Sequence, residues 1–230
     1  RITLTGQLGF GVTARDLIQT ILRDATPDGR LLQCCVEFDG DGVSSLSLDD
    51  RQTVLASLFH SGAYTGIMEP DAAALDYVRA GNGGRPWQVV RADPGAEYLT
   101  RMAYDLGAVT PMVTVPPDAH GAVPVGDAAG QRIDQASIGS CAGNRIEDMR
   151  DAARLLRGRQ VAPHVTLYIT PGSREVYATA AREGLLEIFA EAGAAVLAPG
   201  CTTCWGYQGV LNDNEVSLST QQFNYQGRNG

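Results

Sequence analysis

The sequence predicts an α/β fold, because segments suited to β-strands alternate along the chain with segments of helical periodicity. Residues 2–5 and 64–68 have the strand pattern, and Thr13 can cap a helix that follows the first of them. The apolar side chains of this helix recur on one face, at Leu17, Ile18, Ile21 and Leu22. A chain of 230 residues with 44% hydrophobic content suits one large or two small globular domains.

The first half of the chain continues this alternation up to a glycine-rich segment. The predicted elements are a strand at residues 31–38, a helix at 47–61 that begins at Ser47, and a short helix at 70–78. Residues 81–86 read Gly-Asn-Gly-Gly-Arg-Pro, a combination that favours turns and linkers. We therefore expect a first α/β domain at residues 1–84 and a second at residues 85–230.

The second half contains a clearer series of strands and helices. Its predicted strands cover residues 136–140, 164–170 and 194–198, and its predicted helices begin at Asn144, Arg174 and Leu185. Residues 97–106 fit neither pattern clearly. The first predicted strand runs into Cys141, and the last is followed closely by Cys201. The carboxyl ends of strands in an open α/β sheet are where ligand crevices form, so we expect these cysteines to meet there.

Three cysteines are therefore expected at one place, since Cys204 completes a C-x-x-C motif with Cys201. Three thiolates suit an iron–sulfur cube that leaves one iron open as a Lewis acid. A structural zinc ion needs a fourth ligand, and His164 begins a strand at the opposite end from the cysteines. A thioredoxin-type redox pair opens a helix, whereas this motif lies in a glycine-rich turn. A cluster, a zinc ion and unmetallated thiols all stay open on residue chemistry alone.

Glu37 is a carboxylate within an apolar strand pattern. With a period of two it shares a face with Gln33 and Cys35, which is typical of a solvated strand face, although a functional role would also explain it. We interpret the adjacent Cys34 and Cys35 as core residues. Five cysteines, an odd number, do not indicate a secreted disulfide framework and favour a reducing, cytoplasmic location.

Charge and hydropathy argue against two kinds of partner. The net charge of -8 is spread over both halves, without the clustered Lys and Arg that nucleic-acid binding needs. No apolar run is long enough to span a membrane and no signal peptide is visible, so neither membrane insertion nor export is expected. The chain starts without Met in a segment that is already strand-like, and we expect a piece of a longer protein.

Several motifs follow one another in the order of a known family. In the second half they are Ile138-Gly139-Ser140-Cys141, Asn144-Arg145-Ile146-Glu147-Asp148, Thr170-Pro171-Gly172-Ser173 and Gly200-Cys201-Thr202-Thr203-Cys204-Trp205-Gly206. In the first half they include Val36-Glu37-Phe38-Asp39-Gly40, Arg51-Gln52-Thr53 and Pro70-Asp71. Over nearly its whole length the chain resembles the aconitase superfamily, and most closely the large-subunit family of 3-isopropylmalate dehydratases.

The resemblance implies stacked three-layer α/β domains of the aconitase iron–sulfur type, without that family's N-terminal and swivel domains. It implies a 4Fe-4S cluster on Cys141, Cys201 and Cys204, and it makes Glu37 the catalytic glutamate and Arg228 a substrate-carboxylate ligand. The implied activity is that of a hydro-lyase (dehydratase or isomerase) on a hydroxy di- or tricarboxylate such as a 2- or 3-substituted malate. The implied partners are a small swivel-domain subunit and the missing N-terminal domain.

The sequence departs from the family pattern around the expected pocket. Ala142-Gly143 stand where members usually have Thr-Asn, and Phe223 replaces an arginine that binds a substrate carboxylate. An aromatic ring cannot pair with a carboxylate, so the family's usual substrate is expected to lose one anchor. The changes favour a different substrate, such as a malate with a less polar arm. The alternative is a non-catalytic aconitase-like protein with a structural or sensing metal site.

Overall fold

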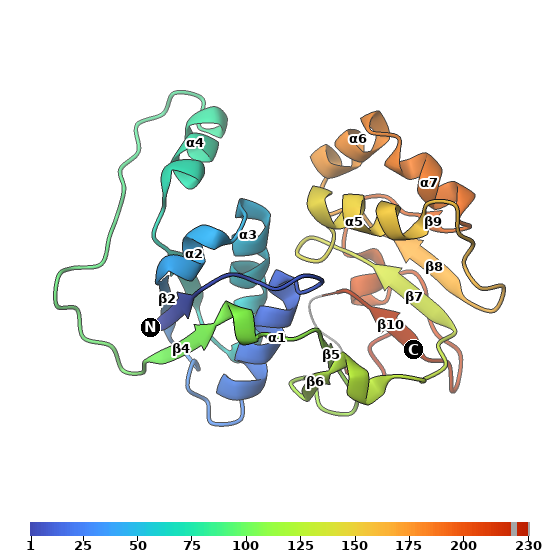
Figure 1. Ribbon diagram of the computed structural model, residues 1–230, viewed down its shortest axis with the longest axis horizontal. Helices are drawn as coiled ribbons and strands as arrows, with labels where there is room; N and C mark the ends of the chain where they lie inside the picture. The colour runs from blue at the N-terminus through green and yellow to red at the C-terminus, as the bar shows by residue number, and fades with distance from the viewer. Residues whose placement is uncertain (222–224, 230) are drawn as a thin grey trace. The chain divides into compact units, whose positions relative to one another are not determined.

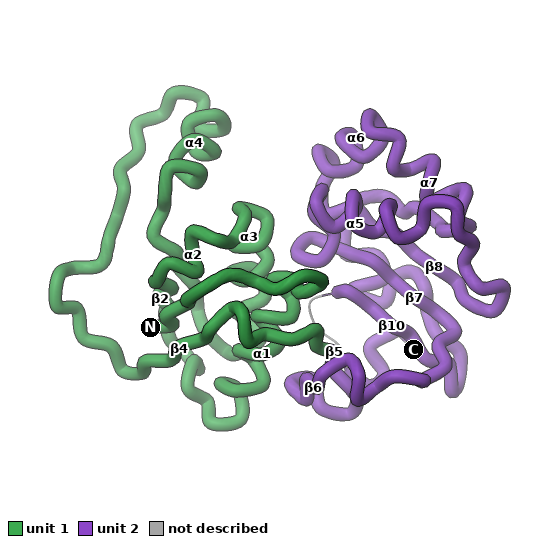
Figure 2. Tube along the Cα trace, viewed as in Figure 1, with its two compact units in different colours: residues 1–112 green, residues 113–230 purple. Residues whose placement is uncertain are grey.

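The computed structural model describes residues 1–221 and 225–229, and it divides into two compact units, Arg1–Met112 and Val113–Gly230 (Figure 2). Each unit contains a parallel sheet with helices, which confirms the predicted α/β class. Among the described residues, no helix combines the length and the apolar character needed to cross a membrane.

Unit 1 is built on a parallel sheet that has four strands among the described residues, in the order β3-β2-β1-β4 (Figure 1). The strands are β1 (Ile2–Thr5), β2 (Cys35–Asp39), β3 (Thr65–Met68) and β4 (Met102–Asp105). The helices are α1 (Ala14–Ala25), α2 (Asp41–Ser45), α3 (Leu48–Ser57) and α4 (Ala72–Gly81). Two short 3-10 turns follow α3 and β4, namely η1 (Leu58–Ser61) and η2 (Leu106–Ala108).

The core of unit 1 lies between α1 and the sheet. The predicted apolar face of α1 is fully buried, and it packs in one cluster with Ile2, Val36 and Phe38 from the central strands. Burying one such Leu or Ile side chain stabilises the fold by about 1.5–3 kcal/mol. Thr13 and Asp16 form a capping box at the start of α1, as expected from the threonine at this position.

Two predicted elements of unit 1 differ in length from the structure. The strand expected at residues 31–38 begins only at Cys35, because Gln33 has a positive φ of 57° and its N–H donates to Gly62 O. The helix expected at 47–61 is capped by Ser47 as predicted, but it tightens into η1 after Ser57.

The extent of unit 1 follows from the contacts of its last strand. β4 pairs in parallel with β1, so the chain returns to the first sheet after the glycine-rich segment. Met112 N then donates to Asp16 Oδ1 of α1 (2.7 Å). The division into units consequently falls after Met112, whereas the sequence suggested residue 84. Figure 1 shows α4 and the segment that follows it extending away from the sheet.

Unit 2 contains a second parallel sheet, with the order β10-β7-β8-β9 among its described strands. These strands are β7 (Gln135–Ile138), β8 (Thr166–Ile169), β9 (Ala195–Val196) and β10 (Ser217–Ser219). A small sheet of β5 (Met112–Thr114) and β6 (Ala122–Pro124) starts at the unit boundary, and β6 leads into η3 (Val125–Ala128). The remaining elements are α5 (Ile146–Leu156), α6 (Arg174–Arg182), α7 (Leu185–Glu191) and η4 (Thr202–Trp205).

Helices α5, α6 and α7 lie together on one side of this sheet (Figure 1). Met149 of α5, Ala180 of α6 and Phe189 of α7 are fully buried and belong to one cluster with Ile169 of β8. The helices therefore hold the sheet from one face, and the segments that carry the cysteines follow the carboxyl ends of its strands.

Candidate active site

The carboxyl edge of the second sheet positions the predicted cysteine ligands. Ile138 of β7 pairs with Ile169 of β8, and Ile169 pairs with Val196 of β9, so the three strands end in one row. Cys141 lies in the turn after β7, and the segment after β9 leads to Cys201, which directly precedes η4. Parallel pairing thus brings together segments that are far apart in the sequence.

Side-chain hydrogen bonds hold the ends of these strands together. Thr170, which follows β8, bonds through its hydroxyl to the hydroxyl of Thr202 in η4 (2.8 Å). Asn144 Nδ2 donates to Thr170 O at 2.9 Å. Gln221 Nε2 donates to the hydroxyl of Thr203. These bonds cross-link the turn after β7, the end of β8 and η4.

Asn144 corrects one sequence expectation. It was expected to cap the following helix, but α5 begins at Ile146 and its N-cap is Arg145, whose N–H donates to Asp148. Asn144 is instead fully buried in the turn. Its Oδ1 is a buried acceptor without a hydrogen-bond partner among the described residues.

Gly143 lies where the backbone of the turn is most tightly packed. A Cβ added at this position would overlap the carbonyl oxygens of Gly139 and Thr220. The turn between β7 and α5 therefore closes tightly on the end of β10, and at this position it has room for glycine but not for a residue with a side chain.

The three cysteines differ in exposure. Cys141 and Cys201 are exposed, whereas Cys204 is buried, with 7% of its surface accessible. Burial raises the pKa of the Cys204 thiol, while the Arg228 guanidinium and the Ser140 hydroxyl act in the opposite direction. Negative charge on Cys141 and Cys201 acts in the same direction as burial and raises the pKa of Cys204 further.

The donor set of this edge fits an iron–sulfur cluster better than a single ion. All five cysteines are free thiols. Among the described residues, no group of three or more His, Cys, Asp or Glu side chains lies close enough together to hold a metal ion. His164, considered as a zinc ligand, is exposed and precedes β8 at the amino end of the strand. In a cluster each cysteine sulfur binds a different iron, so the sulfurs need not converge on one ion, and three free thiols in the turns after β7 and β9 match its ligand chemistry.

Arg228 lies at the buried cysteine. Its Nε donates to Cys204 O at 2.6 Å, and its Nη2 donates to Cys204 Sγ at 3.3 Å. The family resemblance implied a substrate carboxylate as the partner of this arginine, and no sequence pattern indicated its contact with Cys204. Phe223, the residue of interest in the same segment, lies outside the described residues.

Glu37 belongs to unit 1, at the middle of β2. Val36 and Phe38 are buried while Glu37 is half-buried, so the predicted period of two is confirmed. Glu37 Oε2 accepts a hydrogen bond from the hydroxyl of Tyr98, and this bond is the main reason why the pKa of Tyr98 is raised above its ordinary value. The Arg101 guanidinium lies 4.7 Å from the centre of the Tyr98 ring. Sequence reasoning missed Tyr98, because residues 97–106 have no clear periodicity.

The neighbours of Glu37 correct another expectation. Cys35 was expected in the core but is exposed, because it begins β2 on the same face as Glu37. Cys34 is partly buried and packs against the core cluster of unit 1.

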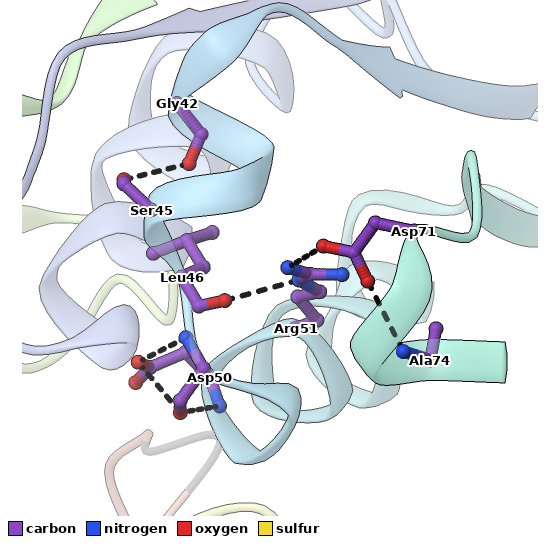
Figure 3. A network of polar contacts seen from close by, with 8 residues as sticks. Gly42, Ser45, Leu46, Asp50, Arg51, Asp71 and Ala74 are labelled. Atoms are coloured by element: carbon purple, nitrogen blue, oxygen red, sulfur yellow. Dashed lines mark hydrogen bonds and ion pairs between the residues drawn. The ribbon is translucent and has the colours of Figure 1, made fainter. Parts of the chain in front are cut away.

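Two further motifs of the resemblance meet in a structural network of unit 1 (Figure 3). Arg51 of α3 is buried, with Nε donating to Leu46 O at 3.1 Å and Nη2 donating to Asp71 Oδ2 at 2.6 Å. Asp71 also accepts from Ala74 N at 3.1 Å as the N-cap of α4. The hydrogen bond from Arg51 is the largest of the effects that lower the pKa of Asp71 to about 2.

Comparison with known proteins agrees with the motifs. A probable 3-isopropylmalate dehydratase large subunit from Methanothermobacter thermautotrophicus is 40% identical over 231 residues, which cover 100% of this chain and 55% of that protein. The 3-isopropylmalate dehydratase large subunit 2 of Rubrobacter xylanophilus is 38% identical, covering 100% of this chain and 54% of that protein. A probable methanogen homoaconitase large subunit from M. thermautotrophicus is also 38% identical, covering 100% of this chain and 55% of that protein.

The chain therefore spans about half the length of the curated relatives it matches. The model of the Aconitase family (aconitate hydratase) matches it at residues 1–132 and 126–230. With full-length similarity to several members and a family match over both units, the chain belongs to the aconitase family.

Proposed function

We propose that this chain is the cluster-holding part of an iron–sulfur hydro-lyase. It would remove and add water on a hydroxy di- or tricarboxylate such as a 2- or 3-substituted malate. The observation that carries the proposal is the set of three free thiols beside the ends of parallel strands, in a chain similar over its full length to proteins named dehydratase and homoaconitase large subunits.

Cys141, Cys201 and Cys204 are the residues that would hold a 4Fe-4S cluster. When bound through three thiolates, such a cluster supplies an open iron with Lewis-acid character. The polypeptide contributes the positioning, because Thr170 and Thr202 join the end of β8 to η4. The exposure of Cys141 and Cys201 keeps this place accessible to a small molecule.

We assign proton transfer to Glu37. In the hydration direction its carboxylate would accept a proton from the water that adds to the substrate, and in the dehydration direction the protonated carboxyl would return that proton to the leaving hydroxyl. The hydroxyl of Tyr98 bonds to Oε2 and so orients the carboxylate, which a general acid–base residue requires in order to act along a defined direction.

We assign Arg228 to a substrate carboxylate, because a guanidinium forms paired hydrogen bonds for which lysine is a poor substitute. Its contact with Cys204 means that a carboxylate bound by Arg228 would lie beside a proposed cluster ligand. Residue 223 is Phe, at the position where the family resemblance implies a second arginine. The loss of that cation favours a substrate with one less polar arm.

The complete enzyme is proposed to need further polypeptide. The similar relatives are named large subunits, and the chain covers 55% of the first of them. A small swivel-domain subunit and an N-terminal domain would supply the remaining acid–base and carboxylate-binding groups. Five free thiols suit a reducing cytoplasm as the location.

Anaerobic reconstitution with iron and sulfide tests the cluster assignment. The protein should acquire about four irons and four sulfides per chain, together with the broad visible absorption of an iron–sulfur cluster. Cys141→Ser, Cys201→Ser and Cys204→Ser should each lose most of this iron. Cys35→Ser is the matched control, because Cys35 is also an exposed thiol but lies on unit 1, and it should keep the full amount. If the wild-type protein takes up no iron in this reconstitution, the proposal is overturned.

The position of Phe223 supports a second candidate, a non-catalytic family member whose metal site serves structure or sensing. Phe223→Arg separates the two candidates when the complete protein is assayed for hydration of a panel of substituted maleates. An enzyme of altered specificity should shift its preference toward the more polar substrates, because an arginine can pair with a carboxylate. Absence of hydration by both proteins, with the cluster present, would favour the second candidate.

A further inference from the structure

Arg228 holds Cys204 at two different atoms. Its Nε donates to the backbone carbonyl at 2.6 Å, a short charge-assisted hydrogen bond. Its Nη2 donates to the sulfur itself at 3.3 Å. One side chain therefore fixes both the backbone and the thiol of the same residue, 24 positions earlier in the chain.

The turn that carries Cys201 and Cys204 lies against the C-terminal segment at further points. Gly206 follows η4 with a φ of +77°, and a Cβ there would lie 2.9 Å from the backbone oxygen of Arg228. Leu211 N donates to Asn229 O at 2.7 Å. The backbone of the C-terminal segment thus approaches this turn closely, and the approach places the Arg228 side chain on Cys204.

The electrostatics of the contact favour an arginine. Cys204 is the one buried cysteine of the three, and burying its thiolate without a cation would be costly. The guanidinium is weakly hydrated and has several donors in a fixed plane, so it can serve the carbonyl and the sulfur together. A lysine in its place would keep the charge but not the two-point geometry.

We infer that Arg228 is a positioning residue for Cys204, which fixes the η4 turn and donates a hydrogen bond to the sulfur of a cluster ligand. The inference rests on the proposed function and adds to the carboxylate-binding role. Groups that orient metal ligands control how firmly the metal is held, and hydrogen bonds to cluster sulfurs raise the reduction potential because they stabilise the more negative reduced state.

The test compares Arg228→Gln and Arg228→Lys with wild type in the full-length protein. Arg154→Gln is the matched control, because Arg154 is an exposed arginine of the same unit that pairs with Asp151 on the surface of α5. In the metal-free state, amide hydrogen exchange should become faster at residues 205–207 in Arg228→Gln, since these amides bond within the turn. After reconstitution, this variant should release iron to a chelator about tenfold faster.

The reduction potential of the cluster, followed by electron paramagnetic resonance, is the readout that a merely structural role would not move. It should fall in Arg228→Gln and fall less in Arg228→Lys, which keeps the positive charge. The inference would be overturned if Arg228→Gln matched the wild-type protein in amide exchange, in the rate of iron release and in reduction potential. Faster amide exchange with an unchanged reduction potential would show that the hydrogen bond to the sulfur has no effect on the cluster. If Arg228→Gln does not fold, Arg228→Lys provides the same comparison.

Failure of the proposed function has a different signature. In that case the wild-type protein itself takes up no iron, and the inference is overturned together with the function. If wild type and Arg154→Gln take up iron equally and Arg228→Gln behaves as they do, only the role of Arg228 is overturned.

Discussion

Tyr98 and Glu37 form the contact of unit 1 that bears most directly on the proposed chemistry. The phenol donates to the carboxylate, so a negative charge lies next to the proton that the phenol would have to lose. The hydrogen bond and the charge of Glu37 both raise the pKa of Tyr98 above its ordinary value of 10.0, while Arg101 acts against them. At neutral pH Tyr98 is therefore a hydroxyl donor, which suits a residue that orients a carboxylate.

Replacing Glu37 should change the titration of Tyr98. In Glu37→Gln the pKa of Tyr98 is expected to fall toward 10.0, because the acceptor loses its negative charge. Nuclear magnetic resonance of labelled tyrosine rings against pH measures this, with the Tyr98 signal assigned from Tyr98→Phe. Glu97→Gln, which removes an exposed charge next to Tyr98 in the sequence, should leave the titration unchanged. An equal titration in wild type and Glu37→Gln would show that the two side chains do not interact.

At the scale of elements, α4 depends on polar contacts because none of its side chains is fully buried. Asp71 caps its first turn and bonds to the buried Arg51 of α3, as Figure 3 shows. The same carboxylate thus begins one helix and ties it to another. The Arg51–Asp71 pair therefore has a structural role within unit 1.

Asp71→Asn should weaken this link in a pH-dependent way. The carboxylate is bound more tightly when charged, so its contribution to stability is fully present above pH 3.8 and is lost as the pH falls toward about 2. Wild type should exceed Asp71→Asn in unfolding free energy by about 1 kcal/mol at neutral pH. This is less than the pKa shift alone implies, because 32% of the Asp71 side chain is exposed. Urea denaturation across this pH range measures the difference.

Asp76→Asn provides the comparison on the same helix. Asp76 pairs with Arg79 at the exposed surface, and such pairs contribute little to stability. Its unfolding free energy should stay close to that of wild type at every pH. If the difference in unfolding free energy between wild type and Asp71→Asn stays the same as the pH falls, the role assigned to the Arg51–Asp71 pair is contradicted.

At the scale of the whole molecule, each unit has a hydrophobic core of its own. The cluster around α1 contains residues of unit 1 only, and the cluster around α7 contains residues of unit 2 only. Separate cores imply that damage to one unit is confined to that unit.

Phe189→Ala is expected to loosen unit 2 selectively. Phe189 is fully buried, and removing such a ring costs about 3–5 kcal/mol. Native-state hydrogen exchange with peptide resolution should show faster exchange over unit 2 and unchanged exchange over unit 1. Ile21→Ala, from the core of unit 1, should produce the reverse pattern. Faster exchange in both units from either substitution would contradict separate cores.

The sequence by itself determined the α/β class, the apolar face of α1, the Ser47 cap and the order of the family motifs. These features depend on residues within a few positions of one another, so periodicity and capping rules suffice to predict them. The expectation that Cys141 and Cys201 follow the carboxyl ends of strands in one sheet also came from local patterns, because parallel strands align their carboxyl ends.

Only the tertiary structure decided which distant residues meet. It showed that Tyr98 hydrogen-bonds to Glu37, Arg228 to Cys204 and Asn144 to Thr170. The two members of each pair are tens of residues apart in the sequence. It also extended unit 1 to Met112, because β4 pairs with β1 across the chain. Such contacts arise when separate elements pack on a common sheet, and a local pattern carries no information about the partner that the packing will supply.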